Sequence, residues 1–244
     1  MSGATQDPPR PAPIDAAQVP CQGADNDVPP VASNAAQHDP IMTPGPLRVW
    51  LGAIFLSASS AAVAGALQVQ VRNGAGKPMP GAVVFLESRE ARLAVKPGRD
   101  VRIAQIKKQF NPSVTVVPIG TPVEFPNLDT VRHHVYSFSQ IKPFELKLYA
   151  GTPANPIVFD RAGIAVLGCN IHDSMAAWVV VVDTPYYART AADGRATLDG
   201  VPPGNYRLRA WHVDLPVGAP ASDDAVAVAD VSTTAIVTLA EAPK

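Results

Sequence analysis

Cysteine is scarce in this chain, with two among 244 residues, Cys21 and Cys169. So few cysteines exclude the multiple disulfides that hold many small secreted domains together. The net charge is −1, and no basic stripe carries interleaved aromatic residues, so nothing indicates a nucleic-acid partner. No long segment keeps a helical period of 3.6 residues. We also find no general acid–base pair and no nucleophile–base set, and therefore expect a protein that is not an enzyme.

The first 41 residues have a composition of their own. They contain eight prolines, no aromatic residue, and five Asp against one Arg, which is a net charge of −4. Such a segment cannot bury enough apolar surface to offset its ordering entropy, so we expect 1–41 to be a disordered arm. Met42 follows it directly, and 1–41 would not be translated if Met42 is the true start.

A secretory signal peptide is predicted over 42–66. Arg48 precedes a short apolar run, and small residues that include an Ala-x-Ala site follow it. Cleavage is expected after Ala64 or after Ala66. The mature protein would then be periplasmic, without stable membrane insertion, and Cys169 would be its one cysteine. An uncleaved membrane anchor is the alternative, although the apolar run is short for a bilayer span.

The rest of the chain has the pattern of an all-β protein. Residues 67–71 alternate apolar and polar, a turn follows at Asn73-Gly74, and 82–86 supply a return strand. Trp178 to Val182 is a continuous apolar run, which predicts a strand buried on both faces. We place one domain at 67–183 and, after the boundary at Thr184-Pro185, a small β-sandwich module at 184–242. Whether 67–90 packs with the first domain or with the second is left open by the sequence.

Potential metal ligands gather in two segments. Cys169, His172 and Met175 follow one another in a Cys-x2-His-x2-Met pattern, and His133 or His134 can add a second imidazole from a distant strand. One thiolate, two imidazoles and one thioether make the donor set of blue-copper sites, with the thioether as a weak axial ligand. Zinc is less suited, because a thioether is a poor zinc ligand. Cys169 and Met175 as plain core residues are the other reading.

The two segments resemble the cupredoxin family. Residues 125–135 look like the cupredoxin pattern Phe-x-Asn-x-Asp-x-x-x-His-Asn-Val, with His134 in place of the Asn. By position the resemblance assigns the copper ligands to His133, Cys169, His172 and Met175. The gap of two residues between His172 and Met175 is similar to that of amicyanins rather than plastocyanins, although Ile171 stands where these proteins usually have Pro. The wider run 159–175 is similar to secreted proteins of the methylamine-utilization type.

The resemblance implies a cupredoxin-like Greek-key β-sandwich. The string from Asp193 to Leu208 resembles transthyretin-like or carboxypeptidase-regulatory-like β-modules, which usually have a structural role. We therefore expect a periplasmic copper protein that carries single electrons between redox protein partners. The alternatives are a copper carrier, chaperone or sensor that uses the same ligands, and a metal-free β scaffold or adhesion protein.

Overall fold

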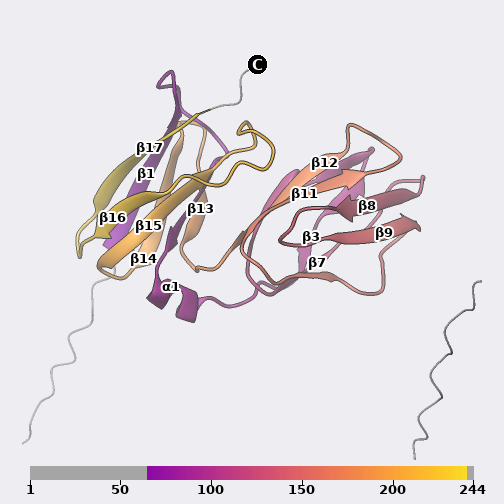
Figure 1. Ribbon diagram of the computed structural model, residues 1–244, viewed down its shortest axis with the longest axis horizontal. Coiled ribbons are helices and arrows are strands. Elements are labelled where there is room, and N and C mark those ends of the chain that lie inside the picture. Colours follow the sequence, from indigo (N-terminus) through magenta and orange to yellow (C-terminus); the bar gives the residue numbers. More distant parts are fainter. Residues whose placement is uncertain (1–64, 241–244) are drawn as a thin grey trace, which may run out of the picture. The chain divides into compact units, whose positions relative to one another are not determined.

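The computed structural model describes residues 65–240, and Figure 1 shows the arrangement of their strands. The predicted all-β class is confirmed, since this part of the chain forms seventeen strands and one short helix. The predicted arm at 1–41 and the signal peptide lie outside the described residues, except for Gly65 and Ala66, which begin the first strand. No helix within 65–240 is long and apolar enough to cross a membrane.

A five-stranded sheet forms one layer of what we call the central sandwich, residues 101–182. Its strands lie in the order β6-β12-β11-β8-β9. Four of these strands are labelled in Figure 1. The bounds are β6 (Val114–Pro118), β8 (His133–Ser137), β9 (Phe144–Tyr149), β11 (Gly163–Cys169) and β12 (Ala176–Val182).

Two smaller sheets complete the central sandwich. One has the order β10-β7-β3 and the other is the β4–β5 hairpin. Side chains from both contribute to one buried apolar cluster with β8, β11 and β12, which includes Phe125, Leu167 and Cys169. The bounds are β3 (Val101–Arg102), β4 (Ala104–Ile106), β5 (Gln109–Asn111), β7 (Thr121–Glu124) and β10 (Ile157–Phe159).

The remaining strands form a second unit, the terminal sandwich, made of residues 65–87 and 187–239. Its two sheets have the orders β14-β1-β17 and β13-β2-β15-β16, and a separate apolar cluster fills it. Helix α1 (Arg89–Ala94) follows β2, and the Ser88 hydroxyl caps its start by accepting from Ala91 N–H. The bounds are β1 (Gly65–Asn73), β2 (Val83–Glu87), β13 (Tyr187–Arg189), β14 (Arg195–Val201), β15 (Gly204–Trp211), β16 (Asp224–Val228) and β17 (Thr233–Leu239).

The strand pairing corrects the predicted start of the first domain at residue 67. β1 pairs with β14 and β17, and β2 pairs with β13 and β15, so both belong with the C-terminal strands. The alternating side chains Leu67, Val69 and Val71 are buried in the terminal cluster rather than in the central one. The central sandwich is therefore an insertion between β2 and β13.

Strand β12 is buried on both faces, as its sequence predicted. Val179 and Val181 belong to the central cluster. Val180 and Val182 belong to a third cluster, which they share with residues of the terminal sandwich such as Phe85. A continuous apolar run is what two covered faces require.

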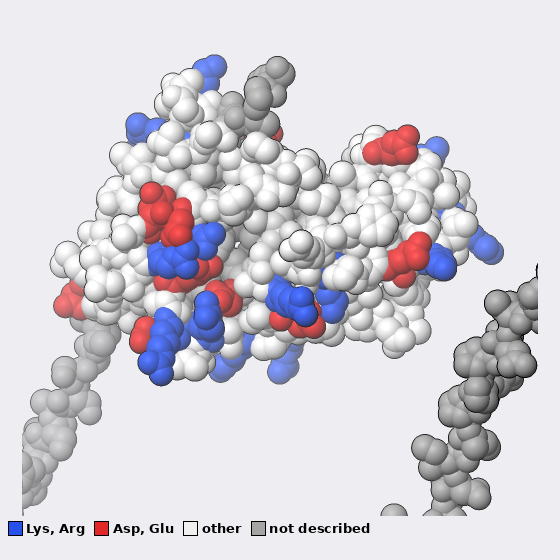
Figure 2. Space-filling model, viewed as in Figure 1, with Lys and Arg blue, Asp and Glu red and all other residues white. Residues whose placement is uncertain are grey.

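Charged side chains of both signs mix on the surface. On the face drawn in Figure 2, acidic and basic side chains adjoin in small groups rather than forming a patch of one sign. Ion pairs such as Arg209–Glu87 and Arg92–Asp183 account for part of this mixing.

Candidate metal centre

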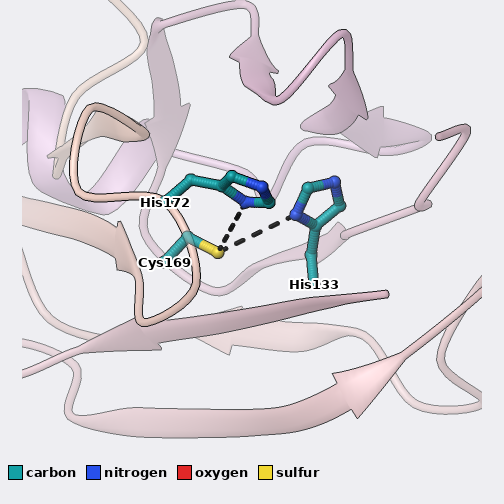
Figure 3. Close-up of side chains that lie close together, drawn as sticks. All are labelled: His133, Cys169 and His172. Carbon is teal, nitrogen blue, oxygen red and sulfur yellow. Dashed lines mark hydrogen bonds between the residues drawn. The ribbon is translucent and has the colours of Figure 1, made fainter. Parts of the chain in front are cut away.

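Three of the predicted ligands lie together at one end of the central sandwich. Cys169 is the last residue of β11, and Val135 of β8 stands opposite it. His133 lies two residues before Val135, and side chains two apart share one face of a strand. His172 comes from the loop between β11 and β12. Figure 3 shows both imidazoles turned toward the Cys169 sulfur.

The ring nitrogens and the sulfur are spaced as for ligands of one ion. Cys169 Sγ lies 3.8 Å from His133 Nδ1 and 4.0 Å from His172 Nδ1. Metal bonds of ~2.3 Å to sulfur and ~2.0–2.1 Å to nitrogen, at an angle of ~120°, would place sulfur and nitrogen ~3.8 Å apart. All three ligand atoms lie within 4.8 Å of one another. The donor set and its spacing therefore fit a transition-metal ion of the copper or zinc class.

The site is closed on one side and open on the other. His133 is 0% exposed and Cys169 is 3% exposed, whereas His172 is half-buried. The two imidazole rings are tilted by 57° with their centroids 5.1 Å apart, so they do not stack. His172 is consequently the most exposed residue of this three-residue group.

Met175, the fourth predicted ligand, closes the loop that carries His172. Its backbone N–H donates to the carbonyl oxygen of His172 at 2.9 Å, so the loop makes a tight turn before β12 begins. The Met175 side chain is 1% exposed and belongs to the same apolar cluster as Cys169. Thioether ligation by Met175 stays a prediction.

His134, the other candidate for the upstream imidazole, faces away from this group. Its Nε2 lies 2.9 Å from Glu145 Oε1, and its Nδ1 lies 3.3 Å from the Asn170 amide nitrogen. Adjacent residues of a strand point to opposite faces, which separates His134 from His133. His134 thus links β8 to β9 and to the residue that follows Cys169.

Asp129 contacts a residue of the candidate site, which the sequence did not reveal. The Nε2–H of His133 donates to Asp129 Oδ2 at 2.8 Å, which leaves Nδ1 free to face the cysteine. Burial raises the pKa of Asp129, but hydrogen bonds from the Lys108 N–H, the His133 ring and the Lys107 N–H outweigh it and keep the pKa below its usual value. Metal-binding histidines commonly donate their second nitrogen to a carboxylate, so an Asp close before a candidate His was the available signal.

A half-buried polar group lies beside the site. Tyr149, opposite His133 on β9, donates its hydroxyl to the carbonyl oxygen of Phe125 at 2.7 Å and accepts from the Gln105 amide at 2.6 Å. Burial raises the pKa of Tyr149 to about 12; the Gln105 bond opposes this shift and the nearby Cys169 adds to it. Tyr149 is therefore a neutral, fixed hydrogen-bonding group near the thiol.

Comparison with known proteins finds partial likenesses. A family model described as "Polysaccharide lyase family 4, domain II" matches residues 162–236, which include strands of both sandwiches. No curated protein matches the chain.

Similar solved structures include a purple cupredoxin from Nitrosopumilus maritimus, with 22% identity over 34% of this chain and 100% of that one, at a TM-score of 0.31. They also include a reduced mutant of amicyanin, with 18% identity over 41% of this chain and 98% of that one, at a TM-score of 0.32. An oxidised amicyanin mutant is similar at 17% identity over the same shares, with a TM-score of 0.32.

Proposed function

We propose that this protein is a periplasmic, amicyanin- or plastocyanin-like copper protein that carries single electrons. The proposed ligands are His133, Cys169, His172 and Met175. The observation that carries the proposal is the convergence of two imidazole Nδ1 atoms on the Cys169 sulfur, at 3.8 and 4.0 Å. Copper bound there would supply one-electron chemistry by alternating between Cu(I) and Cu(II).

The chain's own residues hold this donor set in a fixed geometry. Cys169 and His133 lie on paired strands, and the Asp129 carboxylate fixes the orientation and tautomer of His133. The Met175 N–H bond to His172 tightens the loop between them. Donors held in this way need to rearrange little when the charge of a bound ion changes, which favours electron transfer.

Burial of the thiol also bears on the enzyme question. A cysteine beside a histidine is the arrangement of thiol enzymes, whose nucleophile must reach a substrate. Cys169 is 3% exposed and both neighbouring imidazoles face its sulfur, so the thiol offers little accessible surface to a substrate. We therefore propose a carrier of electrons rather than an enzyme.

Exposed apolar side chains in the loop that carries His172 and in the loop before His133 would suit a transient protein partner. Ile171 is 50% exposed in the same loop, and Leu128 and Val131 are 65% and 39% exposed in the loop that leads to His133. Exposed apolar side chains near one another often mark interaction sites. We propose that a periplasmic redox protein docks here, after export directed by the signal peptide at 42–66.

The visible absorption spectrum of the copper-loaded protein tests this function. We expect a thiolate–Cu(II) charge-transfer band that reversible reduction bleaches. Cys169→Ser should abolish the band, while Ser174→Ala, an exposed position in the same loop, should retain it. A band that survives Cys169→Ser would exclude the assignment. A protein that stays colourless and metal-free after copper addition would favour a metal-free β scaffold. Retention of Cu(I) alone, with transfer of the ion to a partner, would favour a copper carrier that does not transfer electrons.

A further inference from the structure

The β4–β5 hairpin has an unusual turn that points toward the metal site. Lys107 and Lys108 connect its strands with φ of 53° and 58°. Positive φ at both central residues is what a two-residue type I′ turn requires, and it is normally met by Asn-Gly rather than by two lysines. Residues with long side chains adopt this unfavourable conformation only where the surrounding structure holds the backbone in it.

The two backbone N–H groups of this turn bind one carboxylate. Lys107 N–H donates to Asp129 Oδ1 at 2.6 Å, and Lys108 N–H donates to Asp129 Oδ2 at 2.8 Å. Oδ2 also accepts from His133 Nε2 at 2.8 Å. A continuous chain of hydrogen bonds therefore runs from the hairpin turn, through Asp129, to the imidazole that faces Cys169.

The hairpin is also fastened to the loop that carries Asp129. Gln105 N–H donates to the carbonyl of Pro126, and Leu128 N–H donates to the carbonyl of Gln105. Gln105 is 0% exposed, and Phe110 on β5 packs in the same apolar cluster as Cys169. These contacts hold the turn in place relative to both Asp129 and the site.

We propose that the β4–β5 hairpin is a positioning element for the metal centre, acting through Asp129 as a positioning residue for His133. The backbone of Lys107 and Lys108 fixes the carboxylate, and the carboxylate keeps the proton of His133 on Nε2 and its Nδ1 lone pair toward Cys169. The inference rests on the proposed function, because it assigns a task to residues around the same site.

Asp129 also adds negative charge behind a ligand. A carboxylate that accepts from the second nitrogen of a ligating histidine makes that histidine more basic. A more basic ligand favours the higher charge of Cu(II) over Cu(I). Removing the charge should therefore raise the reduction potential and weaken Cu(II) binding.

The test compares Asp129→Asn with the double variant Lys107→Gly/Lys108→Gly. We expect Asp129→Asn to weaken Cu(II) binding by about 10–100-fold and to raise the reduction potential. In nitrogen-15 NMR spectra of the metal-free variant, His133 should no longer be fixed in its Nε2–H tautomer. The double glycine variant should match the wild type in all three measurements, since glycine adopts positive φ and keeps both N–H donors. If Asp129 had only a structural role, Asp129→Asn would lower the stability of the protein and leave the His133 tautomer, the Cu(II) affinity and the reduction potential unchanged.

The outcomes separate this inference from the proposed function. Wild-type protein that shows the thiolate band, together with an Asp129→Asn variant unchanged in tautomer, affinity and potential, would overturn the positioning role alone. Loss of Cu(II) affinity in the double glycine variant would overturn the proposal that the backbone N–H groups of Lys107 and Lys108 hold Asp129, because it would show that the lysine side chains are needed. If Asp129→Asn fails to fold, slow amide exchange of Lys107 and Lys108 and a fixed Nε2–H tautomer in metal-free wild-type protein support the inference, and rapid exchange with a mixed tautomer overturns it.

Discussion

Replacing His133 and His134 separately by alanine should have effects of very different size, although the two residues are adjacent. His133 is fully buried, and truncating a buried side chain of this size typically destabilises a protein by about 2–5 kcal/mol. Its loss also leaves Asp129 without one hydrogen-bond partner. The His134 side chain is 12% exposed and its partner Glu145 is 47% exposed, and a pair with one exposed partner contributes about 0–1 kcal/mol.

Two measurements check this prediction. Urea unfolding of the metal-free proteins should give a large loss for His133→Ala and a small one for His134→Ala. Copper titration, followed by the thiolate band, should then show no band for His133→Ala and a normal band for His134→Ala. The affinity of His133→Ala should fall by more than about 100-fold, because losing a ligand exceeds the effect of losing a residue that supports one.

The reverse outcome would refute the register of β8. A band that disappears in His134→Ala and persists in His133→Ala would require β8 to shift by one residue against β11. A shift of one residue moves every side chain of a strand to its other face. The pairing of Cys169 with Val135 would then be wrong, and with it the site geometry.

Three further predictions concern the surroundings of the site and the start of the mature chain. Gly168→Ala should destabilise the protein by about 1–3 kcal/mol, since a Cβ there would lie 2.6 Å from the Tyr136 ring; urea unfolding should show this loss largely relieved in the Gly168→Ala/Tyr136→Ala double variant. N-terminal sequencing of exported protein should begin at Gly65, because Gly65 pairs with Val201 in β1; a start at Leu67 would contradict this. Stability should fall between pH 10 and about 12, where the unfolded tyrosine loses its proton and the pKa of folded Tyr149 is raised to about 12; Tyr149→Phe should weaken that dependence, and an unchanged slope would contradict the assignment.

Local pattern was enough to predict strands but not their partners. The alternation of Leu67, Val69 and Val71 predicted both a strand and its buried face. Its neighbours, β14 and β17, lie more than a hundred residues away along the chain. Alternation states which side chains are buried and carries no information on which sheet buries them, so the sequence left the place of 67–90 open.

The candidate site was predictable where its residues are close in sequence. Cys169 ends β11 and His172 follows three residues later, and the resemblance to the cupredoxin pattern favoured His133 of the upstream pair. The support for His133 was not predictable, because it combines a loop carboxylate with a turn formed by Lys107 and Lys108. Two lysines are not a signal for a type I′ turn, and their N–H groups both donate to Asp129, which is a contact that the sequence pattern does not show.

The insertion of the central sandwich explains how one chain can hold both units. β2, before the insertion, and β13, after it, are adjacent antiparallel strands, with Phe85 opposite Tyr187. The chain therefore leaves and re-enters the terminal sandwich at neighbouring points, which is the arrangement that tolerates an inserted domain. β12 directly follows the loop that carries His172. On one face of this strand, Val180 and Val182 pack in a cluster shared with Phe85 of the terminal sandwich. On its other face, Val179 and Val181 pack in the same apolar cluster as Cys169. The candidate metal centre and the terminal sandwich thus pack against a common strand, β12, so the residues that surround the candidate ligands extend beyond the central sandwich.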